Sequence, residues 1–195
     1  MNVFILNTGR CGSTTFAKAC SHIENFTAKH ESRTHLLGES RLNYPPNHIE
    51  ADNRLSWLLG RLDETYGDSA FYVHLTRERE QVAESFVKRY DSGIIEAYRG
   101  KGIMLNLPDN SNPLDVARDY CETVDSNIRL FLRDKSMKMN IQLETIEVGF
   151  RDFWEKIGAE GDIEGAIKEF SIRHNASKEP NPKKPSLLGK ILSKK

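Results

Sequence analysis

Short apolar runs alternate along the chain with segments of helical periodicity, and this alternation predicts an α/β fold with a parallel sheet. The clearest runs cover residues 3–6 and 71–75, and continuous apolar runs of this length are typical of strands buried on both faces. Weaker strands are expected at 26–29 and 139–143. We therefore expect a central parallel sheet of about four or five strands flanked by helices.

Apolar residues recur every three or four positions in the segments between these runs, as they do along one face of a helix. The longest such segment extends from Pro113 to Phe131, with its proline in the first turn. Shorter helices are predicted at 16–23, 55–62, 82–90, 150–157 and 163–170. The polar segment 31–52 and the segment 93–112 are predicted to be long loops.

The chain has 195 residues, of which 38% are hydrophobic, and this supports one domain with a real core. Its 28 basic and 28 acidic side chains balance, which argues against a general nucleic-acid-binding surface. The three cysteines are too few for a disulfide framework and lack the spacing of a zinc site. No apolar run approaches the ~20 residues of a membrane span, and the strand at 3–6 leaves no room for a signal peptide, so we expect a cytoplasmic protein.

The charge balance hides an asymmetry, because residues 177–195 contain six lysines and one glutamate. Three prolines in the same stretch prevent a regular helix. We therefore predict a domain at 1–176 and a flexible Lys/Pro-rich tail at 177–195. The tail ends in a short basic amphipathic segment, which we expect to be solvated and to make at most a weak contact with an anionic membrane surface.

The strongest chemical signal is the segment 8–16, TGRCGSTTF, between the first strand and the first helix. A glycine-containing turn exposes backbone N–H groups, and the helix after it contributes its positive N-terminal end. Arg10 adds a guanidinium, and three hydroxyls follow at Ser13, Thr14 and Thr15. The segment therefore predicts a binding site for an anion such as a phosphate.

A nucleoside-triphosphate loop is the obvious alternative, and it has the form GxxxxGK[ST]. Here Gly9 and Gly12 are three positions apart instead of five, and no lysine follows Gly12. A magnesium-dependent small-molecule kinase of related topology is therefore kept only as an alternative function.

The segment 10–15, Arg-Cys-Gly-Ser-Thr-Thr, resembles the 5′-phosphosulfate loop of sulfotransferases that use 3′-phosphoadenosine 5′-phosphosulfate (PAPS). That loop has the form [KR]-x-G-[ST]-[ST]-[TS], with arginine in the Golgi and tyrosylprotein branches. A second match is Arg77 at the end of the strand 71–75, with Ser85 eight residues later. In the family an arginine and a serine at this spacing bind the 3′-phosphate of the cofactor.

The resemblance implies a three-layer P-loop-like fold, PAPS as the cofactor, 3′,5′-ADP as the product and no metal. It implies that Arg10, with backbone N–H groups of Cys11, Gly12, Ser13, Thr14 and Thr15, binds the phosphosulfate. Arg77 and Ser85 would then select PAPS by its 3′-phosphate. The three histidines at 22, 48 and 74 lack metal-ligand spacing and are interpreted as structural or surface residues.

A third match concerns the base that takes the proton from the acceptor. Glu31-Ser32-Arg33 resembles the E-T-R of the tyrosylprotein branch, which implies that Glu31 is the base. Cytosolic branches use a histidine in this neighbourhood, so His30 and His35 stay as alternatives, and we favour Glu31.

Further site residues are predicted with fewer observations. The segment 173–177 lies where the family has its last cofactor-contacting loop, which implies cofactor contacts for Arg173 and Asn175, although the RKGxxGxWK pattern of cytosolic members is missing. A long loop between a catalytic carboxylate and a helix is a common place for a substrate pocket, so Arg33, Tyr44 and Arg54 are predicted to bind the acceptor. A thiol beside Arg10 can have a lowered pKa, but we expect Cys11 to be simply a tolerated small residue.

The expected reaction is transfer of a sulfuryl group from PAPS to a hydroxyl or amine of a small-molecule, glycan or lipid acceptor. No nucleic-acid partner is expected, and the sequence does not indicate the acceptor or the oligomeric state. Besides a kinase, the alternative is a nucleotide-binding module without catalysis.

Overall fold

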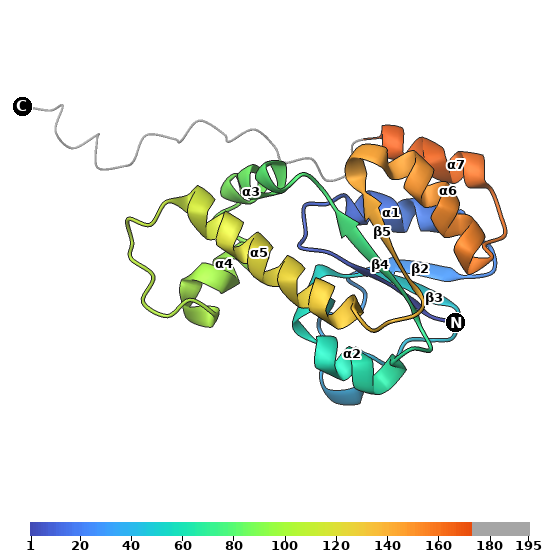
Figure 1. The fold of residues 1–195 in the computed structure, drawn as a ribbon, viewed down its shortest axis with the longest axis horizontal. Coiled ribbons are helices and arrows are strands. Elements are labelled where there is room, and N and C mark those ends of the chain that lie inside the picture. The colour runs from blue at the N-terminus through green and yellow to red at the C-terminus, as the bar shows by residue number, and fades with distance from the viewer. Residues whose placement is uncertain (173–195) are drawn as a thin grey trace, which may run out of the picture.

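A computed structural model of the chain describes residues 1–172 (Figure 1). The predicted cofactor contacts of Arg173 and Asn175, the domain end at 176 and the predicted tail all lie outside the described residues. Helices in the described part do not combine the length and the apolar character that crossing a membrane requires.

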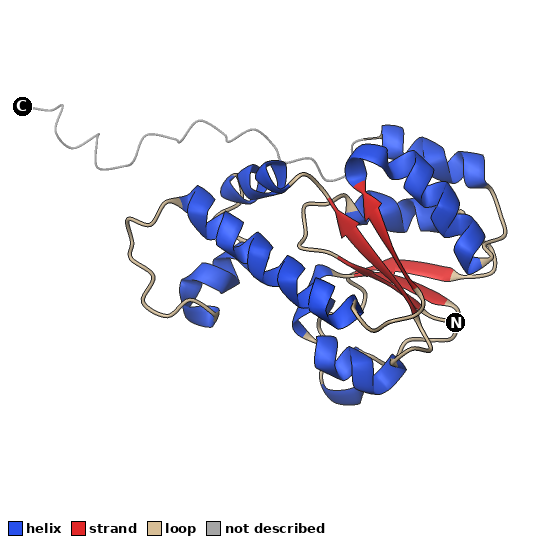
Figure 2. Cartoon of the chain, viewed as in Figure 1, coloured by secondary structure: helices blue, strands red, loops and turns tan. Residues whose placement is uncertain are grey.

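The core of the fold is a five-stranded, fully parallel sheet, which confirms the predicted α/β class (Figure 2). Its strand order is β2-β3-β1-β4-β5. The strands are β1 (Val3–Leu6), β2 (Thr27–His30), β3 (His48–Ala51), β4 (Phe71–Thr76) and β5 (Lys138–Gln142). In the central pairs, Val3 of β1 lies opposite Ile49 of β3 and Phe71 of β4.

Helices cover both faces of the sheet, which gives three layers: α1, α6 and α7 lie on one face, and α2 and α5 lie on the other (Figure 1). The helices are α1 (Ser13–Cys20), α2 (Leu59–Tyr66), α3 (Arg79–Val87), α4 (Gly93–Ala97), α5 (Pro113–Leu132), α6 (Ile146–Ile157) and α7 (Ile163–Lys168). Successive strand residues point to opposite faces. Accordingly, the Phe71 ring packs on Phe153 of α6, whereas the Tyr72 ring packs on Phe131 of α5.

The prediction of a loop over residues 31–52 is wrong near its end, because residues 48–51 form the strand β3. All four residues of β3 are buried, including the polar side chains of His48 and Glu50. His48 Nε2 and Glu50 Oε2 lie 2.9 Å apart, and Glu50 also accepts hydrogen bonds from Ser32. The strand looks polar in sequence because of His48 and Glu50, and both side chains can be buried because they hydrogen-bond to each other and to neighbouring residues.

Two further predicted segments differ in detail. The predicted helix at 55–62 is a short 3-10 helix, Asn53–Trp57, followed by α2. The predicted loop at 93–112 contains α4 and a further turn, Tyr98–Gly102, in which Gly100 and Lys101 leave helical geometry. Tyr98 and Ile95 of this segment are buried, so it packs on the domain instead of extending from it.

The topology determines where a ligand can bind. The carboxyl ends of all five parallel strands lie at one edge of the sheet, and ligands of open α/β sheets bind at that edge. The segments that leave β1, β2, β3 and β4 there are 7–12, 31–32, 52–54 and 77–78.

Candidate functional site

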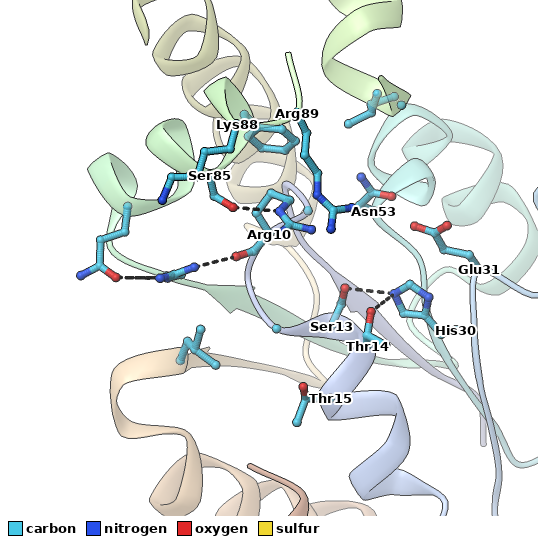
Figure 3. A pocket seen from close by; sticks show the side chains of 18 of the residues that line it. Arg10, Ser13, Thr14, Thr15, His30, Glu31, Asn53, Ser85, Lys88 and Arg89 are labelled. Carbon is cyan, nitrogen blue, oxygen red and sulfur yellow. Dashed lines mark hydrogen bonds between the residues drawn. The ribbon is translucent and has the colours of Figure 1, made fainter. Parts of the chain in front are cut away.

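A cavity of about 890 Å³ opens at this edge of the sheet (Figure 3). It is lined by the segment after β1, the start of α1, the residues after β2 and β3, and α3 with the turn that follows it. Ten of its lining residues are labelled in Figure 3: Arg10, Ser13, Thr14, Thr15, His30, Glu31, Asn53, Ser85, Lys88 and Arg89.

The loop after β1 has the backbone of an anion cradle. Gly9, Arg10 and Gly12 have φ angles of 86°, 61° and 84°, and residues in this left-handed region turn successive N–H groups toward one concave surface. A Cβ atom at Gly9 would lie 2.8 Å from Asn53 Nδ2, and one at Gly12 would lie 2.8 Å from Leu143 Cδ1. The loop therefore needs glycine at both positions.

The predicted cations meet at this loop. Arg10 Nε donates a hydrogen bond of 2.9 Å to Ser85 Oγ, although the two residues are 75 positions apart. Arg77 Nη1 donates to the Arg10 carbonyl oxygen at 3.4 Å, and the same guanidinium donates to Gln81 Oε1. Both predicted motifs, from the ends of adjacent strands β1 and β4, thus contribute to one site.

The electrostatics of the cavity favour an anionic ligand. Its lining has five basic side chains, those of Arg10, Arg54, Arg77, Lys88 and Arg89, and two acidic ones, those of Glu31 and Glu84. Burial lowers the pKa of Arg10, and repulsion by Arg89 and Arg77 lowers it further. An anion held among these guanidinium groups would relieve that repulsion.

The residues proposed as the base lie on the other side of the same cavity. His30 Nε2 is 3.1 Å from Ser13 Oγ and 3.3 Å from Thr14 Oγ1, so the imidazole is tied to the first residues of α1 (Figure 3). Glu31 Oε2 forms an ion pair of 3.0 Å with Arg54 Nη1. Both side chains of that pair are about one-third exposed, which leaves them accessible from the cavity.

Two buried carboxylates hold this base region in place: Glu50 in β3 and Asp52 directly after that strand. Glu50 accepts from Ser32 N at 2.7 Å and from Ser32 Oγ at 2.6 Å, directly after Glu31. Asp52 accepts from Arg54 N at 2.8 Å and pairs with Arg41 at 2.5 Å. Glu50 therefore supports the backbone directly after Glu31, and Asp52 supports the backbone of Arg54 itself.

Three predicted side chains lie away from the cavity. Tyr44 is buried against Phe4 and stacks on His48, so it fills the core between the sheet and α2 instead of contacting an acceptor. Arg33 lies over the Tyr44 ring and donates to Ser40 O. Neither these two residues nor the exposed His35 line the cavity, whereas Arg54, the remaining predicted acceptor contact, does.

The thiol of Cys11 also points away from the cavity lining. Its Sγ atom is 3.2 Å from Thr8 Oγ1 and 3.3 Å from Gly9 O, and burial raises its pKa to about 12. The pKa is therefore not lowered, which agrees with the expectation of a tolerated small residue, since burial outweighs the nearby positive charge. Cys11 can contribute only backbone groups to the loop.

Sequence reasoning missed five polar lining residues: Gln81, Glu84, Lys88, Arg89 and Ser92. Lys88 and Arg89 follow Ser85 by about one helical turn, and this spacing was a usable signal.

Comparisons of this chain with protein-family models, with curated proteins and with solved structures find no match. Among residues 1–172 there is also no group of three or more His, Cys, Asp and Glu side chains placed to hold a metal ion. The function must therefore be argued from the chemistry of the cavity.

Proposed function

We propose that the protein is a sulfotransferase that transfers a sulfuryl group from PAPS to a hydroxyl or amine of a small-molecule, glycan or lipid acceptor. The observation that carries this proposal is the convergence of two separate motifs on one cavity. The glycine-containing loop with Arg10 and the pair Arg77 and Ser85 meet there through the hydrogen bond from Arg10 to Ser85.

The chain's own residues suit the anions of such a cofactor. Backbone N–H groups of the loop, the N-terminus of α1 and the Arg10 guanidinium would bind the phosphosulfate. Arg77, on the β4 side, would bind the 3′-phosphate with the hydroxyl of Ser85. When bound, PAPS supplies a sulfuryl group attached to a phosphate leaving group. Preorganised donors of this kind commonly stabilise a transition state by a few kcal/mol each, which is about 100-fold in rate.

Glu31 is the proposed base. It lines the cavity opposite the α3 side, and the backbone of Ser32 directly after it is held by the buried Glu50. Its pairing with Arg54 orients the carboxylate, and Oε2 is the oxygen engaged in that pair. His30, tied to two hydroxyls of α1, is the alternative base.

We also propose that the reaction takes place in the cytoplasm. The three cysteines of the described chain form no disulfide and are buried as free thiols. This arrangement suits a reducing compartment.

The first test compares two nucleotides by isothermal titration calorimetry. We expect 3′,5′-ADP to bind at least about tenfold more tightly than 5′-ADP, because the 3′-phosphate gains charge-assisted hydrogen bonds from Arg77. Arg77→Gln should remove this preference and leave 5′-ADP affinity nearly unchanged. The matched control is Arg129→Gln, which removes an exposed arginine of α5 that lies outside the cavity.

Equal affinity of the wild-type protein for both nucleotides would contradict the proposal. Tight, selective binding of 3′,5′-ADP together with no sulfated product, sought by mass spectrometry in extracts incubated with PAPS, would instead favour a nucleotide-binding module. Magnesium-dependent turnover of ATP would favour a kinase.

A further inference from the structure

Arg89 is a guanidinium beside Arg10 that no sequence motif identified. It follows α3 and lies four residues beyond Ser85, so the two side chains project from about the same helical face. Its backbone continues the last turn of α3, because Arg89 N donates to Phe86 O at 2.9 Å. Ser85 and Arg89 both line the cavity, and Figure 3 shows Arg89 extending toward Arg10 and Asn53.

The sheet order places Asn53, toward which Arg89 extends, and Arg77 on opposite sides of β1. Asn53 follows β3 and Arg77 follows β4, and these two strands flank β1 on opposite sides. Arg77 is held on its side by hydrogen bonds to Gln81 Oε1 and the Arg10 carbonyl oxygen. Arg89 reaches the Asn53 side of Arg10, which is the side on which Glu31 lies (Figure 3).

The geometry restricts what Arg89 can bind. In the proposed reaction the transferring group lies between the phosphate held by the loop and the base that activates the acceptor. Arg10 and Arg89 both face the space between the loop and Glu31, and their mutual repulsion lowers the pKa of Arg10 after the larger effect of burial. Two guanidinium groups placed together in this way suit a tetrahedral oxyanion, which accepts several hydrogen bonds.

We infer that Arg89, together with Arg10, binds the oxygens of the sulfuryl group during its transfer, which makes Arg89 a further catalytic residue. The identity of the anion rests on the proposed function. In the step, the acceptor oxygen or nitrogen forms a bond to sulfur. The bond from sulfur to the 5′-phosphate oxygen breaks with its electron pair going to the phosphate, and Glu31 takes the acceptor proton.

The experiment titrates inorganic sulfate into the protein saturated with 3′,5′-ADP, a pair of probes that together represent the two parts of PAPS. Arg89→Gln should raise the dissociation constant of sulfate at least about tenfold, the effect of losing one charge-assisted contact. It should change 3′,5′-ADP affinity by less than about twofold. Arg77→Gln should weaken 3′,5′-ADP binding and leave the affinity for sulfate nearly unchanged. Arg129→Gln should change neither affinity.

Arg89→Lys separates charge from geometry, because lysine keeps the charge and loses the two-pronged donor. It should recover only part of the sulfate affinity. Thermal unfolding of each variant verifies that the fold is kept.

Three results would overturn the inference: sulfate affinity unchanged in Arg89→Gln, 3′,5′-ADP affinity lost equally in Arg89→Gln and Arg77→Gln, or no sulfate binding by the wild-type protein. Failure of the proposed function would look different, since the wild-type protein would then show no preference for 3′,5′-ADP over 5′-ADP. In that case sulfate titration of the nucleotide-free wild-type and Arg89→Gln proteins still decides whether Arg89 binds an oxyanion.

Discussion

The two sides of the cavity are built on different kinds of strand. We call the loop 9–12 with Arg77, Ser85 and Arg89 the anion half, and His30 and Glu31 with Asn53 and Arg54 the base half. The anion half follows β1 and β4, which are apolar except for His74 and Thr76 and are almost wholly buried. The base half stands on β2, which is partly exposed, and β3, which buries Glu50.

Because of this difference, polar side chains serve ligand binding in the anion half and the stability of the fold beneath the base half. In the anion half, the polar contacts around Arg10 are part-buried and face the cavity, while apolar burial holds the strands beneath. Beneath the base half, the carboxylates of Glu50 and Asp52 have no exposed surface, so their hydrogen bonds are structural. Substitutions in the anion half should therefore affect mainly ligand binding, whereas those under the base half should affect stability as well.

The largest effect is expected for Glu31→Gln in the base half. Glutamine cannot take the acceptor proton, so sulfuryl transfer should fall by about 10²–10⁴-fold. Binding of 3′,5′-ADP should change by less than about twofold, because its contacts lie in the other half. Transfer is measured as incorporation of radioactive sulfur from labelled PAPS into extract acceptors.

His30→Gln is the matched comparison for this variant, since it changes the neighbouring residue of the same half. If transfer survives in Glu31→Gln and disappears in His30→Gln, the base is His30.

The next largest effect is expected for Asp52→Asn beneath the base half. Asp52 and Arg41 form a pair of 2.5 Å with side chains 0% and 6% exposed. Loss of one charge leaves the other uncompensated, which should lower the free energy of unfolding by about 3–5 kcal/mol in urea denaturation. Glu80→Gln is the control, because Glu80 pairs with Arg118 at the exposed surface, and its effect should be much smaller.

A double variant, Asp52→Leu with Arg41→Met, replaces the pair with apolar side chains of similar size. It should be more stable than Asp52→Asn, because no buried charge is left without a partner. If the double variant is the less stable one, the buried pair, together with the hydrogen bond that Asp52 accepts from Arg54 N, contributes more than its desolvation costs.

The same contrast explains which elements the sequence could predict. β1, β4 and α5 were predicted because their apolar positions are continuous or follow the helical period. β3 was not, because His48 and Glu50 occupy positions i and i+2 on one face and satisfy each other there. A hydropathy pattern does not distinguish a buried, hydrogen-bonded pair of polar side chains from two exposed polar side chains.

The site divides in a similar way. Arg10, Arg77 and Ser85 line one cavity because Arg10 and Arg77 lie at strand-to-helix junctions, which parallel strands bring together, and Ser85 lies on the helix α3 that follows Arg77. Tyr44 was misplaced because its neighbours depend on β3. Arg89 was missed because no motif pointed to it, although it follows Ser85 by about one helical turn within the predicted helix at 82–90.

A smaller effect, with a defined pH dependence, is expected for Glu50→Gln. Burial alone would raise the pKa of Glu50, but hydrogen bonds from His48 and Ser32 outweigh it and set the pKa below the ordinary value of 4.5. The carboxylate therefore stabilises the fold fully above about pH 4.5, and this contribution is lost as the pH falls through the folded-state pKa. At pH 7 the variant should lose about 1–3 kcal/mol of unfolding free energy.

The measurement is urea denaturation of the wild-type and Glu50→Gln proteins between neutral pH and the acid transition. The difference in unfolding free energy between them should shrink as the pH falls below 4.5, because the wild-type carboxyl becomes neutral like the amide. A difference that is independent of pH would show that the charge on Glu50 does not support the base half.

The smallest effect is expected for Cys11→Ala in the anion half. The thiol is 2% exposed and its pKa is raised to about 12 by burial, so it should react with a thiol reagent such as DTNB only when the native protein opens. Its replacement should change 3′,5′-ADP affinity by less than about twofold, because the loop offers backbone N–H groups at this position.

Comparing Cys11→Ala with Gly12→Ala, at the next position, tests whether the backbone conformation of the loop determines ligand binding in the anion half. Alanine there must adopt a φ angle near 84° with its Cβ atom 2.8 Å from Leu143 Cδ1, so the loop has to shift. We expect it to weaken 3′,5′-ADP binding by about tenfold or more, which corresponds to the roughly 1–3 kcal/mol of a strained backbone position. If Cys11→Ala weakened binding as much as Gly12→Ala, side-chain packing around the thiol, and not backbone conformation, would determine the shape of the anion half.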